Sequence, residues 1–86
     1  MSWRLRDRVS WAPTEYGGVL LDCASGEYWT LNSTAAAVLA ALLAGADIAG
    51  ATAHLAGEFD GDLDVVAVEV PQLVAELQGA GLVVER

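Results

Sequence analysis

The sequence predicts an α+β domain in which a three-stranded antiparallel sheet is followed by three helices. Its 86 residues are enough for a single domain, residues 1–86, and 55% of them are hydrophobic against 19% charged, which is far from the composition of a disordered chain. Near residue 32 the pattern of apolar residues changes from one that repeats every second residue, as in a strand, to one with a helical period. Strands are therefore expected before this point and helices after it.

Three short runs in the first part of the chain have strand character. Residues 8–11 alternate polar and apolar side chains and stop at the Ala-Pro pair that ends with Pro13. Residues 19–23 follow a pair of glycines, and a tight connection then leads into residues 27–31, which are rich in aromatic and β-branched types. Two hairpins joining these runs give the predicted sheet.

Two helices are expected next. The first follows an N-cap at Asn32 or Ser33 and ends at Gly45. Its apolar positions recur at i, i+3, i+4, i+7 and i+8 and form a core-facing stripe: Ala35, Val38, Leu39, Leu42 and Leu43. Asp47 can cap the second helix, which ends near Glu58. One side of that helix carries Ile48, Thr52, Leu55 and Phe59.

A third helix is expected after a cap at Asp64, and Gly79 and Gly81 stop it. Its apolar stripe consists of Val66, Val70, Leu73, Val74 and Leu77. Pro71 lacks an N–H and clashes with the carbonyl four residues back, so we expect a kink there or a helix that becomes regular only after Val70. Residues 82–84 then form a short extended tail.

The charge distribution restricts the partners. The formal net charge is −8, no lysine is present, and residues 9–85 hold eleven carboxylates without one lysine or arginine. A protein surface without these cations cannot neutralise phosphates, so nucleic acid is a poor partner. A basic peptide or a basic protein surface is attracted instead.

Nothing in the sequence directs the chain into or across a membrane. The longest apolar run, residues 35–44, is shorter than the roughly 20 residues that a bilayer crossing needs. The N-terminus has no secretion signal, and a single cysteine rules out an intramolecular disulfide. We therefore expect a soluble cytoplasmic protein.

No catalytic or metal-binding constellation is visible. Cys23 and His54 lie in different halves of the chain, so Cys23 is interpreted as a small buried side chain at a strand end and His54 as a half-exposed helix residue. The run from Asp60 to Asp64 begins like a calcium loop, but the sixth and twelfth positions hold valine and proline. We expect no enzyme activity, no metal and no cofactor.

Two features exceed what a simple fold requires. Residues 27–31 would form a sheet edge that no proline or lysine protects, and such an edge can accept another strand unless a loop or the C-terminal tail covers it. The start of the third helix is apolar on more than one face, which is typical of a helix that is buried on two sides or lines a groove; the residues are Val65, Val66, Ala67, Val68 and Val70.

Several segments together resemble the PqqD-like family of leader-recognition proteins for ribosomally made, post-translationally modified peptides. Residues 26–35 fit the pattern Gly-x-Tyr-x-x-Leu-Asn-x-Thr-Ala, and they are accompanied by Gly-Gly-Val-Leu-Leu-Asp at residues 17–22, Leu-Val-Ala-Glu-Leu at 73–77 and Gly-Leu-Val at 81–83. The resemblance runs from about Val9 to Val84, and as a stand-alone domain the chain is most similar to the lasso-peptide branch.

This resemblance implies a winged helix-turn-helix-like fold and non-catalytic binding of a precursor's leader peptide. The leader would add as a strand to the third strand and lie in a groove against the third helix. The implied peptide-binding residues are Glu27, Tyr28, Trp29, Thr30, Leu31, Val66, Glu69, Val70, Leu73 and Leu77. Glu69 stands where the family often has an aspartate. The implied partners are the precursor leader, a separate leader protease and a macrocyclase.

Two other functions are compatible with the same elements. A winged-helix transcriptional regulator also has three helices beside a β-wing, although the cation-free body disfavours it. A small interaction domain could instead use the exposed strand to form a homodimer.

Overall fold

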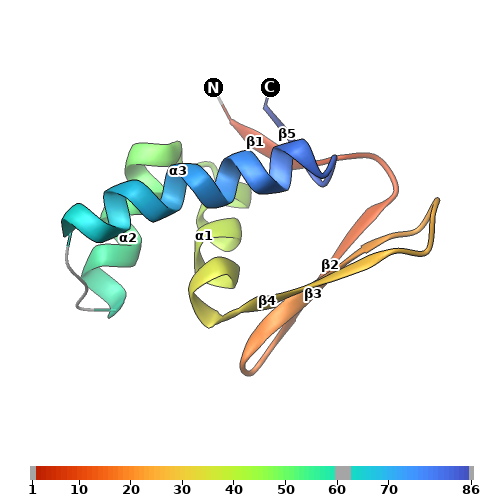
Figure 1. The fold of residues 1–86 in the computed structure, drawn as a ribbon, viewed down its shortest axis with the longest axis horizontal. Helices are drawn as coiled ribbons and strands as arrows, with labels where there is room; N and C mark the ends of the chain where they lie inside the picture. Colours follow the sequence, from red (N-terminus) through yellow and green to blue (C-terminus); the bar gives the residue numbers. More distant parts are fainter. Residues whose placement is uncertain (1, 60–62, 86) are drawn as a thin grey trace.

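The computed structural model describes residues 2–59 and 63–85 and confirms an α+β fold with a three-stranded antiparallel sheet and three helices (Figure 1). The elements in chain order are β1 (Trp3–Leu5), β2 (Val9–Thr14), β3 (Gly17–Asp22), β4 (Tyr28–Asn32), α1 (Ser33–Leu43), α2 (Ile48–Phe59), α3 (Leu63–Gly79) and β5 (Val83–Glu85). Within the described ranges, no helix has both the length and the apolar character needed to cross a bilayer.

The three-stranded sheet has the order β2-β3-β4. β2 continues through Pro13 to Thr14, so the expected stop at the Ala-Pro pair is wrong. Proline is tolerated there because β2 is an edge strand of this sheet. The backbone nitrogen of Pro13, which carries no hydrogen, can face the unpaired side. A Cβ on Gly18 would overlap the indole ring of Trp11, so the close packing of this ring on β3 requires glycine.

A second, two-stranded sheet joins the two ends of the described chain, which lie side by side in Figure 1. β1 pairs antiparallel with β5 in a register that sets Trp3 opposite Glu85 and Leu5 opposite Val83. β1 has no signal in the sequence and was not predicted, and residues 82–84 were expected only as an extended tail. That tail therefore pairs with β1 and does not cover β4.

Side chains cap the first two helices as expected. Asn32 is the N-cap of α1, because its Oδ1 accepts a 2.8 Å hydrogen bond from the N–H of Ala35. Asp47 Oδ1 accepts a 2.7 Å bond from the N–H of Gly50 at the start of α2. Gly45 has a φ of 109°, so it supplies the left-handed conformation that ends α1.

The third helix begins earlier than expected and is continuous at Pro71. α3 begins at Leu63, so Asp64 lies in the first turn and is not the cap. Asp60–Asp62 of the calcium-like run lie outside the described residues. The helix runs through Pro71 without a break, and the predicted late start after Val70 is wrong. Pro71 and Ala67 are both exposed, so water can reach the carbonyl that proline leaves without a donor.

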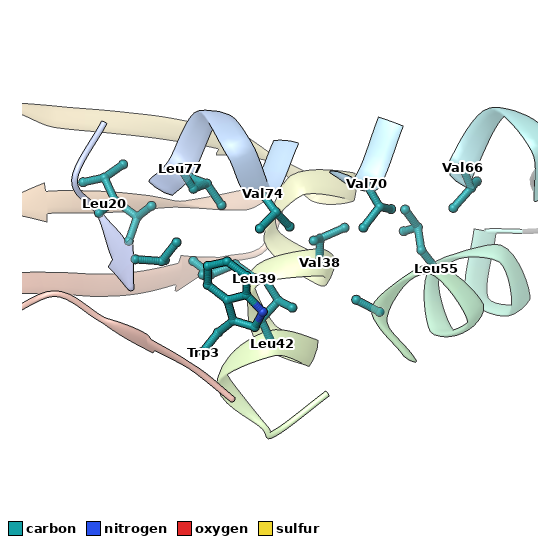
Figure 2. Close-up of a cluster of buried hydrophobic side chains, with 13 residues drawn as sticks. Trp3, Leu20, Val38, Leu39, Leu42, Leu55, Val66, Val70, Val74 and Leu77 are labelled. Atoms are coloured by element: carbon teal, nitrogen blue, oxygen red, sulfur yellow. The ribbon is translucent and has the colours of Figure 1, made fainter. Parts of the chain in front are cut away.

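The core collects buried side chains from both sheets and all three helices (Figure 2). Leu20, Leu39 and Leu42 are completely buried, and Trp3 of β1 closes the cluster with 7% exposure. Cys23 is exposed, which makes its assignment as a buried residue wrong. It follows β3 on the outward face shared with Leu21, because neighbouring side chains of a strand point to opposite faces.

Candidate functional site

The strand β4 has one paired and one open edge. It pairs with β3 along its length, in a register that sets Trp29 opposite Leu20 and Leu31 opposite Gly18. Within residues 2–59 and 63–85, no strand pairs with its other edge. An edge of this kind carries backbone donors and acceptors that an extended peptide can use.

One hydrogen bond fixes which residues of β4 face the open edge. The N–H of Asp22 donates to the carbonyl of Glu27 at 2.9 Å, so these two residues form a hydrogen-bonded pair at the start of the β3–β4 ladder. Bonded and non-bonded pairs alternate in antiparallel sheets, which turns the backbone groups of Trp29 and Leu31 toward β3. The N–H and C=O groups of Tyr28 and Thr30 therefore face the open edge.

The side chains of β4 point alternately to the two faces of the sheet. Trp29 and Leu31 are half-buried and pack against the core, whereas Tyr28 and Thr30 are exposed on the outer face of the sheet. Tyr28 keeps 68% of its surface exposed. The strand thus presents an apolar inner face beside a hydrogen-bonding edge.

A groove of about 380 Å³ lies between β4 and the C-terminal half of α3. It is lined by side chains and backbone from β4, α1, α3 and the turn after α3: Trp29, Thr30, Leu31, Asn32, Ala35, Leu73, Glu76, Leu77, Ala80 and Leu82. The groove brings together five of the predicted peptide-binding residues, namely Trp29, Thr30, Leu31, Leu73 and Leu77.

The helical wall of this groove has a simple periodicity. Leu73, Glu76, Leu77 and Ala80 are spaced at i, i+3, i+4 and i+7, so they share one side of the C-terminal part of α3 and the turn that follows. Leu77 is buried at 4% exposure, while Glu76 is exposed. The wall is therefore apolar at its base and carries a carboxylate at its rim.

Half of the residues that line the groove are absent from the predicted set. Asn32, Ala35, Glu76, Ala80 and Leu82 line the groove but were not predicted for it. The helical spacing from Leu73 would have found Glu76 and Ala80. Leu82 reaches the groove only because the chain turns back after α3, which no local pattern indicates.

The remaining predicted residues lie outside the groove. Val66 and Val70 are buried in the core at 7% and 1% exposure. In Figure 2 the buried side of α3 runs from Val66, which lies near Leu55 of α2, to Leu77, which lies near Leu20 of the sheet. Glu69 is exposed and borders a separate shallow hollow that includes Val65 and Val68.

Two more predicted residues flank β4 or lie on its outer face. Glu27 is exposed and immediately precedes β4, while Tyr28 begins that strand. Neither lines the groove, although the backbone of Tyr28 faces the open edge. Both residues are reached only by a peptide that continues along the strand toward the β3–β4 turn.

The groove contains neither residue considered for catalysis. The thiol of Cys23 is exposed and lies 3.6 Å from Ser10 Oγ on the outer face of the sheet, and His54 is an exposed residue of α2. In the part of the chain that the structure describes, no three histidine, cysteine or acidic side chains lie close enough to hold a metal ion. The arrangement can bind an extended chain through backbone hydrogen bonds and apolar contacts.

Comparisons with known proteins agree with this geometry. A family model described as coenzyme PQQ synthesis protein D (PqqD) matches residues 17–83, which include both walls of the groove. A solved structure of a lasso peptide synthetase B1 complexed with the leader peptide is 38% identical, covers 99% of this chain and 100% of its own, and superposes with a TM-score of 0.88.

A second solved structure shows the same fold at lower identity. TbiB1 in complex with the TbiA(beta) leader peptide is 20% identical, and the superposition covers 95% of this chain and 94% of that one with a TM-score of 0.80. Comparison with curated proteins gave no match.

Proposed function

Because the chain belongs to the PqqD family, we propose that it binds the leader region of a ribosomally made precursor peptide, as a recognition element of lasso-peptide biosynthesis. The observation that carries this proposal is the open edge of β4 beside an apolar groove against α3. The 38% identical synthetase component that was solved with a leader peptide supports the ligand class.

In this proposal the leader adds as an antiparallel strand to β4. The outward backbone groups of Tyr28 and Thr30 supply the ladder hydrogen bonds, which give affinity independent of leader sequence. Every second leader side chain then points into the groove, where Trp29, Leu73 and Leu77 offer apolar contacts. An aromatic side chain or a proline of the leader is suited to serve as the anchor.

Selectivity would arise at the rim of the groove. Glu76 places a carboxylate beside the apolar base, and the whole chain carries a net charge of −8. A leader with a lysine or arginine near its apolar anchor gains both a local partner and faster association.

The predicted residues outside the groove receive indirect roles. Val66 and Val70 hold α3 in place through the core, so we assign them to positioning of the helical wall. Glu69 lies about two helical turns before Leu77, so a leader reaches it only if it extends beyond the groove. Glu27 is available to a leader that continues toward the β3–β4 turn.

The domain itself performs no chemistry in this proposal. It holds the leader so that a separate protease and a macrocyclase meet their substrate at an effective concentration on the order of millimolar. Its winged-helix-like arrangement serves peptide recognition, and the cytoplasm, where ribosomes make the precursor, is its place of action.

A steric block of the groove tests the proposal. Ala80 lines the groove and Ala75 is an exposed residue of α3 outside it, so Ala80→Arg and Ala75→Arg add the same side chain and charge at different places. Calorimetry with the leader peptide of the 38% identical synthetase complex should show binding by the wild type and A75R and at least about tenfold weaker binding by A80R. Equal affinity of the two variants would contradict the assignment of the groove.

A further inference from the structure

A second surface differs from the rest of the molecule in its charge. Arg4, Arg6 and Arg8 border a polar hollow of about 560 Å³, to which Asp7 and Asp22 also contribute. Residues 9–85 contain no lysine or arginine at all. Three of the four arginines of the chain are therefore gathered at one place, on a body whose residues 9–85 are acidic.

The backbone that carries these arginines is fixed at several points. β1 pairs with β5, which sets Arg4 opposite Val84. The N–H of Arg6 donates to the carbonyl of Leu82 at 3.0 Å, and the carbonyl of Arg8 accepts a 2.8 Å bond from the N–H of Cys23. Buried Trp3 and half-buried Leu5 alternate with the arginines, so Arg4 and Arg6 share the exposed side of this segment.

Arg8 occupies a conformation that favours another residue. The N–H of Val9 donates to the carbonyl of Arg6 at 3.1 Å and closes a turn in which Arg8 has a φ of 70°. Among the described residues, Arg8 is the one non-glycine residue with positive φ. Glycine or asparagine fits this position with less strain, so the arginine is not explained by the turn itself.

Neighbouring carboxylates neutralise the arginines only in part. Arg4 Nη1 lies 3.9 Å from Asp7 Oδ1, and both side chains are exposed, at 51% and 95%. Asp22 Oδ1 already accepts bonds from the N–H groups of Ala24 and Ser25. Within residues 2–59 and 63–85, no ion pair involves Arg6 or Arg8. Their guanidinium groups have donors available for a ligand.

We propose that this arginine hollow is a second binding site, which takes a short acidic segment of a partner protein. Arginine binds carboxylates through two parallel hydrogen bonds, so two or three glutamates or aspartates of an extended segment complement Arg4, Arg6 and Arg8. A short segment meets only the hollow, whereas a long polyanion such as nucleic acid also meets the carboxylates around it.

The hollow and the groove are separate and can be occupied together. The turn after α3 lies between them, since Ala80 and Leu82 line the groove while a Cβ on Gly81 would lie 2.8 Å from Arg6 Nη1. A partner held at the arginines would therefore stay next to the end of the groove. The new site does not depend on leader binding, so it can be tested with the free protein.

Fluorescence anisotropy with labelled hexaglutamate tests the proposal. At about 50 mM salt, where charge screening is moderate, R6Q and R8Q should each weaken binding about fivefold, and R4Q/R6Q/R8Q should weaken it at least about twentyfold. Gln72→Glu changes the net charge by the same single unit at an exposed position of α3 and should leave affinity within about twofold.

Arg8→Gly separates binding from folding. Glycine relieves the positive φ, so R8G should melt no lower than the wild type while losing affinity for hexaglutamate as R8Q does. No binding of hexaglutamate by the wild type, equal losses in Q72E and R6Q, or unchanged binding by R8G would each overturn the site. Binding of a DNA oligonucleotide of similar charge as tightly as the peptide would overturn the assignment to an acidic protein segment.

Discussion

The backbone N–H of Asp22 donates to the carbonyl oxygen of Glu27 at 2.9 Å, and this bond sets the hydrogen-bonding phase of β4. It leaves Gly26 at a φ of 80° as a bulge beside the pair, with the N–H of Gly26 also directed to the Asp22 carbonyl at 2.7 Å. The same phase decides which positions of β4 tolerate the loss of an N–H group.

Thr30→Pro should separate leader binding from folding. The N–H of Thr30 faces the open edge, so proline there should leave the β3 ladder intact and cost stability mainly through its fixed φ. We expect a modest fall in melting temperature and at least about tenfold weaker leader binding. Leu31→Pro is the matched control, because it removes an N–H that faces β3 and should destabilise the fold much more. Comparable destabilisation by both variants would mean that the phase is wrong.

N-methylation of single leader amides should weaken binding with a period of two. A methylated amide that donates to the edge loses a ladder bond and adds a clash, at a cost of about 1–3 kcal/mol or roughly 5- to 150-fold in affinity. The adjacent amide points away and should be nearly insensitive. Calorimetry on a methylation series reads the pattern directly, and a period of 3.6 or uniform sensitivity would show that the leader does not bind as a strand.

Gly18→Ala should destabilise the domain by about 1–3 kcal/mol, because its Cβ overlaps the ring of Trp11 in a close-packed sheet. Gly57→Ala is the control substitution. A Cβ on Gly57 meets nothing within 4 Å, and alanine in a helix should stabilise by about 0.5–1 kcal/mol. Urea unfolding measures both free energies, and the two changes should have opposite signs.

Asn32→Ala should lower the free energy of unfolding by about 1 kcal/mol, since it removes the side chain that caps α1. Asn32→Asp preserves an acceptor for the N–H of Ala35 and should restore most of this loss. Because Asn32 also lines the groove, leader affinity should be compared under conditions where both variants are folded. A similar stability for the alanine and aspartate variants would argue against a capping role.

Replacing both Cys23 and His54 by alanine should leave assisted leader removal unchanged. Both side chains are exposed and neither lines the groove, so we expect little effect on folding and none on peptide binding. Turnover by the leader protease in the presence of the variant is the measurement. Loss of turnover with leader binding intact would reveal a catalytic contribution of these residues.

The elements that the sequence could predict are those with a strong local pattern. The alternation in β4 and the stripe of α1 locate these elements within about one residue of their observed bounds, and Asn32 was identified as a possible cap. β5 was expected only as an extended tail and β1 was not predicted. Each is three residues long, so only tertiary contacts could reveal that they pair.

The site was only partly predictable, because an apolar stripe in a helix sequence does not show which element the helix packs against. The 17 residues of α3 span about 25 Å, longer than the five residues of β4. Val66 and Val70 therefore lie on the part of the helix near α2, while Leu73 and Leu77 reach the groove. The same limitation explains Cys23, since its exposure depends on which face of the hairpin the helices cover.

The pairing of Trp3 with Glu85 also has a consequence for protein engineering. An enzyme fused before β1 and one fused after β5 would be attached at adjacent points, so exchanging the fusion end should change its distance from the groove very little. The same proximity makes a circular permutant accessible: a short linker can join the two strands, and new ends can be opened in the exposed turn at residues 24 and 25.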